Sequence, residues 1–288
     1  MDPKAVRRSE REMHFGVAAA KQALADSGFE IDDANRTDVG VVFGSGAGGQ
    51  QLMIDNFTTL VEKGPNRVQP TFIANALVDS TSGMISIETG AIGHNIAIVS
   101  ACSTGTHNVA EGAEAIRRGD CIAVISGSTE APLLEVAHAG FTNMRGMGLP
   151  RPGEPLQTVS RPFDATRNGF VLGEGAGSLF LEDLELAKAR GAHIYAEVIG
   201  SGSAADGWDM VQPIDDGLAS VTFGKPLNGN DRAHVDSPRP RRRPRPCGAA
   251  PPCPAAASGC GAHRPRRFLP GWSRATTNGI SAATIAAF

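Results

Sequence analysis

Residues 95–126 follow the order strand, turn, helix and strand, and this succession constrains the fold more than any other stretch of the sequence. The first part, 95–100 (NIAIVS), is rich in β-branched residues and short enough for a buried strand. Residues 104–118 carry apolar side chains on one face of a helix that stops at Gly119. Residues 121–126 (CIAVIS) have the composition of the next buried strand. Such a unit predicts strands covered by helices, that is, a layered α/β fold.

The same alternation continues on both sides of this unit. The sequence predicts, in chain order, a helix over 15–27, a strand over 39–43, a helix reaching residue 63, a helical region over 73–88, a strand over 171–182, a helix over 184–190 and a strand over 194–200. This pattern is typical of α/β domains. We expect one globular body over residues 1–220, because that part is long enough to bury a substantial core.

Composition divides the chain near residue 220. Residues 1–220 carry 16 basic and 28 acidic side chains, a net charge of −12, whereas residues 221–288 carry 11 and 2, a net charge of +9. Within the second part, 237–265 contains no Ile, Leu, Val, Phe or Met. Such a segment does not bury enough apolar surface to fold by itself, so we expect 221–288 to be a disordered tail. Its abrupt change to Arg, Pro, Ala and Cys is also what a GC-rich gene gives when it is read out of frame.

The tail bears on partners, metals and location as well. The arginine run 239–245 suggests a nucleic-acid-binding arm, but no aromatic residues interleave it and the acidic body would repel phosphates, so no nucleic-acid partner is expected. Cys247, Cys253 and Cys260 lack the spacing of a zinc site, and no metal is expected. The odd number of cysteines, with no hydrophobic leader after Met1 and no stretch of membrane-spanning length, predicts a cytoplasmic protein without a membrane partner.

Cys102 lies in the stretch 99–107 (VSACSTGTH), between the predicted strand and the start of the predicted helix. A thiol at this position faces unpaired backbone N–H groups and the positive end of the helix dipole, which favour the reactive thiolate. Ser103 and Gly105 are small enough to let a substrate carbonyl approach the same N–H groups. The stretch therefore indicates a nucleophilic cysteine. The alternative is a buried structural cysteine, since free cysteine is among the most buried residue types.

Residues 44–49 (GSGAGG) form a glycine loop between a predicted strand and a predicted helix, with the spacing of the dinucleotide-binding fingerprint. A dinucleotide site also needs a second strand that ends in an acidic residue about 20 residues further on. Here Glu62 ends a helical segment, with no apolar strand before it. A tight strand-to-helix turn is the better interpretation, and a nucleotide-binding oxidoreductase stays the alternative.

Four motifs, in order, carry a resemblance to a known family. They are 44–49 (GSGAGG), 100–108 (SACSTGTHN), 161–164 (RPFD) and 168–177 (NGFVLGEGAG). On these residues the chain resembles the β-ketoacyl-acyl carrier protein synthases, the condensing enzymes of the thiolase superfamily. The resemblance covers the N-terminal half of such an enzyme, over residues 1–220. It implies an incomplete thiolase-like layered α/β fold, mostly the first of two similar halves.

The resemblance implies an acyltransferase that makes carbon–carbon bonds in fatty acid or polyketide synthesis. Cys102 would take an acyl group from acyl carrier protein as a thioester, and malonyl carrier protein would lose carbon dioxide to give the carbanion that attacks it. The backbone N–H of Cys102 would form half of the oxyanion hole. The implied partners are acyl carrier protein with acyl and malonyl groups and, in the intact family, a second subunit of a homodimer or heterodimer. No cofactor is implied.

Three further positions match the family's substrate channel. Leu77, Phe141 and Phe170 fall where the family lines or gates its acyl channel, and a shaped apolar tunnel sets chain length by excluding methylenes. Each of the three is equally compatible with a place in the core. We therefore treat them as candidate substrate-binding residues.

Three polar residues in the matched motifs are expected to be structural. His107 matches a family position, but it lies five residues after Cys102 on the same helix. That is poor geometry for a general base, so we expect a packed histidine. Glu174 and Asp164 are expected to hold loops by hydrogen bonds and not to move protons.

The sequence also departs from the family. The family's opening strand and V-T-G-x-G-like turn precede the region that here starts at Met1. The family's second half supplies histidines in N-A-H-G-T and G-H contexts, a nearby lysine and a closing G-F-G-G, and none of these strings occurs in the second half of this chain. His234 and His263 stand in other contexts. We therefore expect a condensation-impaired fragment. A non-catalytic partner subunit of a condensing enzyme is a further alternative, against which the retained Cys102 argues.

Overall fold

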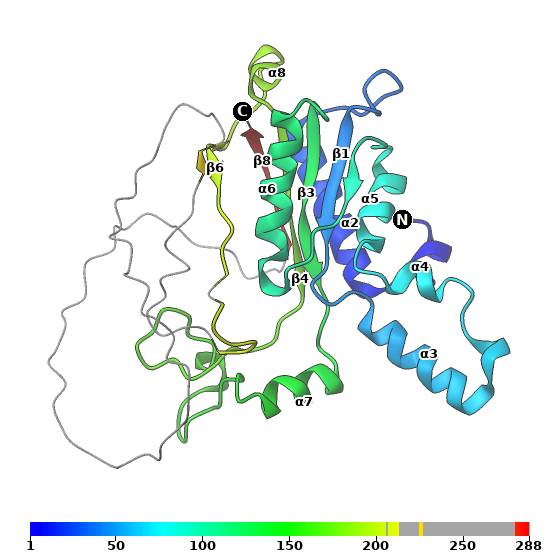
Figure 1. Ribbon diagram of the computed structural model, residues 1–288, viewed down its shortest axis with the longest axis vertical. Coiled ribbons are helices and arrows are strands. Elements are labelled where there is room, and N and C mark those ends of the chain that lie inside the picture. Colours follow the sequence, from blue (N-terminus) through cyan, green and yellow to red (C-terminus); the bar gives the residue numbers. More distant parts are fainter. Residues whose placement is uncertain (206, 213–224, 227–279, 288) are drawn as a thin grey trace, which may run out of the picture. The chain divides into compact units, whose positions relative to one another are not determined.

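The computed structural model describes residues 1–205, 207–212, 225–226 and 280–287 (Figure 1). A six-stranded sheet has the order β2-β1-β3-β4-β8-β5, and a second sheet pairs β6 with β7. The strands are β1 (Val39–Gly44), β2 (Asn95–Ile96), β3 (Ala123–Glu130), β4 (Gly175–Asp183), β5 (Glu197–Val198), β6 (Gly200–Ser201), β7 (Lys225–Pro226) and β8 (Ile280–Ala287). β1 runs parallel to β2 and β3, β3 is antiparallel to β4, and β8 is parallel to β4 and β5.

Helices connect the strands. In the described residues they are α1 (Pro3–Val6), α2 (Arg11–Ser27), α3 (Gln50–Lys63), α4 (Phe72–Ala76), α5 (Ser80–Thr89), α6 (Thr104–Arg117), α7 (Glu135–Asn143) and α8 (Leu184–Ala189), with 3-10 turns at Pro65–Arg67, Ala101–Ser103 and Leu156–Thr158. Local chemistry sets several ends. α2 stops at Gly28, whose φ of 62° is left-handed, and the Asp183 side chain caps α8 by accepting the Leu186 N–H at 3.0 Å.

The two faces of the large sheet bury different side chains, because alternate residues of a strand point to opposite faces. Between this sheet and the helices α2 and α5, one cluster buries Val17, Ala20, Ala23, Val39, Val41, Phe43, Ile85, Ala91, Ala123, Ile125 and Phe180. The face against α6 buries Val42, Ala113, Ala115, Ile116, Cys121, Val124 and Leu181. Figure 1 shows α6 in front of the strands and α2 behind them. The helix that follows Cys102 is thus packed directly on the centre of the sheet.

The α/β class is confirmed, but the predicted strand over 95–100 is wrong in extent, since only Asn95 and Ile96 pair with a neighbouring strand. Two N–H groups of the segment are taken by side chains of α6 instead. Ile98 N–H donates to Asn108 Oδ1 at 2.9 Å, and Ser100 N–H donates to Thr104 Oγ1 at 3.0 Å. Residues 97–100 are therefore tied to the helix rather than to the sheet.

Other element boundaries also differ from the sequence prediction. The helical region over 73–88 is split, because Leu77 after α4 has an extended backbone, with ψ of 152°. β4 starts at Gly175 rather than at residue 171, because its pairing with β3 begins at Gly175, opposite Glu130. α7 lies in a stretch for which the sequence pattern gave no helix.

Little of the predicted tail is described. Of residues 221–288, the structure describes 225–226 and 280–287, and both are strands. The arginine run, the three tail cysteines, His234 and His263 lie outside the described residues. In the described part of the chain, no helix combines the length and the apolar character needed to cross a membrane.

Candidate active site

Cys102 lies in the 3-10 turn Ala101–Ser103, directly before α6, and is exposed. Ser103 N–H donates to the Ser100 carbonyl at 3.1 Å and closes the turn. Ala101 has a left-handed backbone with φ of 51°, which costs a non-glycine residue about 1–2 kcal/mol. Strained backbone of this kind persists where surrounding structure enforces it, commonly at functional sites. The thiol therefore stands on a sharp turn at the start of a helix, as the sequence predicts, and not in the core.

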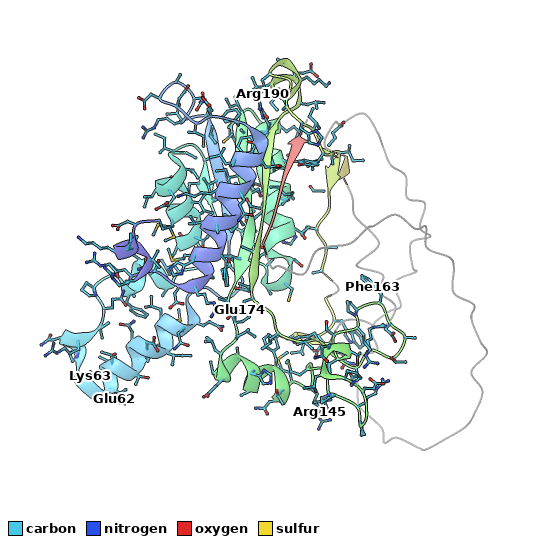
Figure 2. All side chains as sticks on the ribbon, turned by 180° about the vertical axis from the view of Figure 1, so that it is seen from behind. Glu62, Lys63, Arg145, Phe163, Glu174 and Arg190 are labelled. Atoms are coloured by element: carbon cyan, nitrogen blue, oxygen red, sulfur yellow. The ribbon has the colours of Figure 1, made fainter. Side chains whose placement is uncertain are left out.

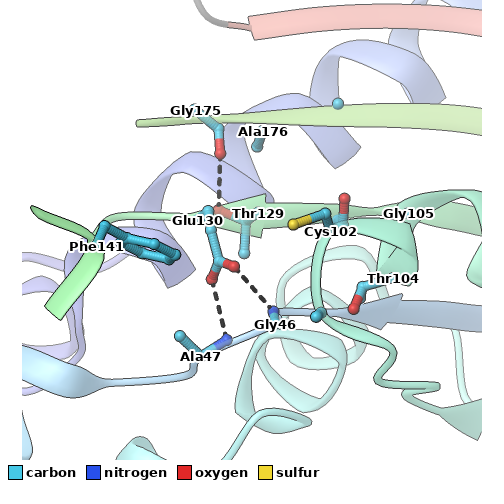
Figure 3. Close-up of a pocket in the computed structure, with 13 residues that line it drawn as sticks. Gly46, Ala47, Cys102, Thr104, Gly105, Thr129, Glu130, Phe141, Gly175 and Ala176 are labelled. Carbon is cyan, nitrogen blue, oxygen red and sulfur yellow. Dashed lines mark hydrogen bonds between the residues drawn. The ribbon is translucent and has the colours of Figure 1, made fainter. Parts of the chain in front are cut away.

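The turn opens into a cavity of about 630 Å³ (Figure 3). Four parts of the chain line it: the glycine loop, the start of α6, the ends of β3 and β4, and α7. The lining residues are Gly46, Ala47, Ala101, Cys102, Thr104, Gly105, Ser128, Thr129, Glu130, Phe141, Gly175, Ala176 and Gly177. Most are small or apolar, so the space beside the sulfur suits an uncharged group.

The first turn of α6 is held close to the sheet. A Cβ on Gly105 would lie 2.5 Å from Ser128 Oγ, so only glycine allows this approach. Asn108, which is fully buried, donates to the Gly127 carbonyl at 3.0 Å and accepts from Ile98 N–H. These contacts fix the start of the helix, and with it the turn that carries the thiol.

The glycine loop is held by a carboxylate of the chain itself. Glu130, at the end of β3, accepts hydrogen bonds from Ser45 Oγ, from Gly46 N–H at 3.2 Å and from Ala47 N–H at 3.3 Å. Gly48 N–H donates to Ser45 Oγ at 2.8 Å. A dinucleotide site would need these N–H groups for its phosphates. Because they are already bonded, the structure favours the tight-turn interpretation over the nucleotide-binding alternative.

The three candidate substrate-binding residues do not lie together. Phe141, on α7, lines the cavity, and Phe170 packs edge-on against it with ring centroids 5.1 Å apart at 84°. Leu77 follows α4, is 51% exposed and is not among the described residues that line the cavity. Of the three positions, the structure therefore brings Phe141 to the cavity, Phe170 only to the far side of a contact with Phe141, and Leu77 to neither.

His107 has hydrogen-bond partners at both ring nitrogens. Nδ1 is bonded to Ser100 Oγ, and Nε2 is 3.0 Å from Ser203 Oγ. The ring is thus held between two hydroxyl groups, and no hydrogen bond to Cys102 is present in the described residues. This arrangement is the packed histidine that the spacing predicts.

Glu174 and Asp164 hold loops, as expected. Glu174 accepts from Leu133 N–H at 3.3 Å and pairs with Arg11, whose Nε is 3.0 Å away. Asp164 accepts from the N–H and Oγ1 of Thr166 at 2.6 and 2.7 Å, and these hydrogen bonds lower the pKa of the Asp164 carboxyl. Figure 2 shows Glu174 among the side chains of the body.

Sequence reasoning missed two carboxyl groups next to the site. Glu130 follows a predicted strand, with no motif that marks it. Glu12, in the first turn of α2, is 2% exposed, and burial, with smaller contributions from the charges of Glu10 and Glu130, raises its pKa to about 7. Its carbonyl accepts from Thr129 Oγ1 at 2.6 Å, which joins α2 to the end of β3. The sequence does not show whether an acidic residue on an otherwise apolar helix face is buried or exposed.

The described residues hold no cluster of three or more metal-ligating side chains. Cys102 and Cys121 are both free thiols, and Cys121 is buried, which raises its pKa. A buried thiol is a poor nucleophile. Of the two described cysteines, Cys102 is therefore the one placed for covalent chemistry.

Comparison with known proteins agrees with this geometry. A family model described as "Beta-ketoacyl synthase, N-terminal domain" matches residues 1–187. The chain is 43% identical over 217 residues to 3-oxoacyl-[acyl-carrier-protein] synthase 2 of Vibrio cholerae and 41% identical to that of Staphylococcus aureus N315, covering 75% of this chain and 52% of each relative. It thus spans about half the length of the curated relatives it matches.

Solved structures show the same relationship. A β-ketoacyl synthase from Burkholderia phymatum aligns with a TM-score of 0.67 at 34% identity, over 76% of this chain and 53% of that one. A type II polyketide ketosynthase, solved in complex with its acyl-carrier protein and bound to a hexaketide, aligns with a TM-score of 0.68 at 28% identity, over 74% and 53%. With the family model covering well over half of its residues, the chain belongs to the β-ketoacyl synthase family, in which it matches the N-terminal domain.

Proposed function

We propose that this chain carries the acyl-acceptor site of a 3-oxoacyl-acyl carrier protein synthase, with Cys102 as the nucleophile. The observation that carries the proposal is the exposed thiol on a strained turn at the start of α6, facing a cavity of about 630 Å³. Family members with the same cysteine motif support this role. The cysteine-free partner-subunit alternative is less favoured, because Cys102 is retained and opens into the cavity.

The proposed step is a transthioesterification. The Cys102 thiolate attacks the carbonyl carbon of an acyl thioester, a new carbon–sulfur bond forms, and the carrier's thiol leaves and takes up a proton. In this proposal, backbone N–H groups of the turn and of the first residues of α6, that of Cys102 among them, stabilise the negative oxygen of the tetrahedral intermediate. Atoms and charge balance without any cofactor.

We propose that condensation needs groups beyond those described. Decarboxylation of a malonyl group builds negative charge on an enolate oxygen, and losing one donor aimed at such an oxygen costs about 2.7–4 kcal/mol, roughly 10²–10³ in rate. The histidine motifs that the family uses do not occur in the second half of this sequence. Acyl transfer is therefore the step that this chain supports, and condensation by it is impaired.

The proposed partners are acyl carrier protein with acyl or malonyl groups, and a second ketosynthase subunit. The polyketide ketosynthase in complex with its acyl-carrier protein supports the first. The edge position of β2, next to the half-exposed segment that leads to Cys102, supports the second, since an open strand edge can pair with another chain. Relatives from both fatty acid and polyketide synthesis leave both pathways as candidates. A free-thiol nucleophile fits a reducing compartment such as the cytoplasm.

Transfer of a radiolabelled acyl group from acyl carrier protein to the purified chain tests the proposal. We expect stoichiometric labelling of the wild type and of Cys121→Ala, and no labelling of Cys102→Ala. With malonyl carrier protein present, we expect no 3-oxoacyl product. Equal labelling of Cys102→Ala would remove Cys102 as the acceptor, and steady formation of product would contradict the impaired condensation.

A further inference from the structure

We propose that Glu130 is a positioning residue of the acyl-acceptor site, because its carboxylate holds the glycine loop 44–49 against the turn that carries Cys102. The inference rests on the proposed function, because it concerns the acyl-acceptor site, but its test does not require acyl transfer. It concerns one carboxylate at the end of β3, which neither the motifs nor the acyl-transfer chemistry assigns a role.

The carboxylate gathers three donors from consecutive residues of the loop. Oε1 accepts from Ser45 Oγ. Figure 3 shows the other two bonds, in which Oε1 accepts from Ala47 N–H and Oε2 from Gly46 N–H. An ionised carboxylate offers two acceptor oxygens, whereas a glutamine amide offers one oxygen and presents two N–H donors in place of the other. Hydrogen bonds to an ionised group are also stronger than neutral ones. Glutamate therefore suits this position, because both of its oxygens accept hydrogen bonds, whereas glutamine would turn an NH2 group towards donors of the loop.

The glycine loop also lies against the turn that carries Cys102. A Cβ on Gly46 would lie 2.7 Å from Glu130 Oε2 and 3.1 Å from the Ala101 carbonyl oxygen. The backbone of Gly46 is therefore enclosed between the carboxylate and the residue before Cys102. Any shift of the loop changes the room beside the sulfur.

The loop and the carboxylate also form the cavity surface. Gly46, Ala47 and Glu130 line the same space as Cys102 and Phe141. Because both carboxylate oxygens are engaged with the loop, Glu130 is not placed to carry a proton for the thiol. Its effect on Cys102 is expected through the shape of the cavity, and hence on reagents that must occupy it.

Two thiol reagents of different length test this. Methyl and decyl methanethiosulfonate both convert the Cys102 thiolate to a mixed disulfide and release methanesulfinate, but only the decyl chain is long enough to extend through the cavity. For Glu130→Gln we expect the decyl rate to fall roughly tenfold relative to the methyl rate, since small displacements of positioning groups have effects of this size or larger. A decyl-to-methyl rate ratio that is raised or unchanged would overturn the proposal, and equal slowing of both reagents counts as unchanged.

Two further variants serve as a control and as a substitute in this test. Glu88→Gln removes a carboxylate that pairs with Lys21 and the Met1 amino group, away from the cavity, and should leave the ratio unchanged. If Glu130→Gln does not fold, Ser45→Ala removes one of the three donors and should lower the ratio by a smaller factor. No carrier protein is used, so failure of acyl transfer and failure of this inference are separate results.

Discussion

The cavity around Cys102 has two walls that are built differently. The sheet wall consists of the glycine loop 44–49, the start of α6 and the ends of β3 and β4, where backbones approach so closely that a Cβ on Gly127 would overlap the Gly177 carbonyl oxygen. The loop wall is the stretch 133–174, which contributes Phe141. Its helix α7 has open space around it, since a Cβ on Gly140 would meet nothing within 4 Å, while the glycines at 146, 148 and 169 are enclosed by neighbours from the same stretch.

Exposure follows the same division. Phe163, in the loop wall, is 100% exposed (Figure 2). Both Phe163 and Arg145 have left-handed backbones. In the sheet wall, Thr104 and Thr129 are buried. The nucleophile is thus fixed by packing of α6 and the glycine loop on the sheet, whereas the loop wall is held mainly by contacts within its own stretch, such as the hydrogen bonds between 146–148 and Phe170. Connecting segments of this kind commonly carry binding functions.

The largest expected difference between the walls is in glycine substitutions. Gly127→Ala should lower the free energy of unfolding by about 4 kcal/mol, because β3 and β4 must separate to admit the methyl group. Gly140→Ala, in the exposed helix α7, should raise it by about 0.5–1 kcal/mol through helix propensity. Urea denaturation of both variants measures the change in the free energy of unfolding. Similar changes for the two variants would contradict the difference between the two walls.

The buried carboxyl behind the sheet wall gives the next effect. The pKa of Glu12 is raised from 4.5 to about 7, so in the pH range between them Glu12 is neutral when folded and charged when unfolded. Its contribution to stability is full below pH 4.5 and is lost as the pH rises towards 7. Glu12→Gln should therefore be more stable than the wild type at pH 8 by about 2–3 kcal/mol, with little difference at pH 4.

Glu154, in the loop wall, is the matched control. Its carboxyl pairs with Arg161, which lowers its pKa, and it is exposed to solvent. Glu154→Gln should change stability little at either pH. A pH-independent effect of Glu12→Gln, measured by urea denaturation at both values, would show that Glu12 is charged in the fold.

A smaller effect is expected at the first turn of α6. Gly105→Ala should cost about 2 kcal/mol and slow the alkylation of Cys102 by iodoacetamide, because the new methyl group presses on Ser128 Oγ and pushes the helix start outward. Removing that hydroxyl in Gly105→Ala/Ser128→Ala should restore both stability and rate. Failure of the second substitution to rescue the first would mean that close packing on β3 does not set the position of the thiol.

The smallest effect is expected for the aromatic pair of the loop wall. Phe170→Ala removes the edge-on contact to Phe141 and should cost about 1 kcal/mol, since Phe170 is already 42% exposed. The rate with methyl methanethiosulfonate should not change. A loss as large as that of Gly127→Ala would show that the loop wall is built as firmly as the sheet wall.

Much of the sheet wall could be predicted from the sequence. Helix 104–118 ends within one residue of its predicted limit, because its apolar face and Gly119 are local signals. The position of Cys102 before that helix followed from the same pattern. The period of the apolar residues and the helix stop at Gly119 involve residues close together in the chain, so both can be read directly from the sequence.

Features that depend on distant partners could not be predicted. Residues 97–100 leave the sheet because Asn108 and Thr104 take the N–H groups of Ile98 and Ser100. Glu130 likewise acts on residues 83–85 positions away in the chain. Leu77 falls where the family lines its acyl channel, but the break after α4 that leaves it exposed has no Gly or Pro to mark it. Side-chain to backbone hydrogen bonds across such separations have no periodic signature.

Peptide mass mapping after incubation with acyl carrier protein bearing a long-chain acyl group tests the central claim most directly. We predict that the peptide containing Cys102 gains the mass of the acyl group through a hydroxylamine-sensitive thioester, while the peptide containing Cys121 keeps its own mass. An acyl group found on Cys121, on both cysteines equally, or on neither would contradict the account.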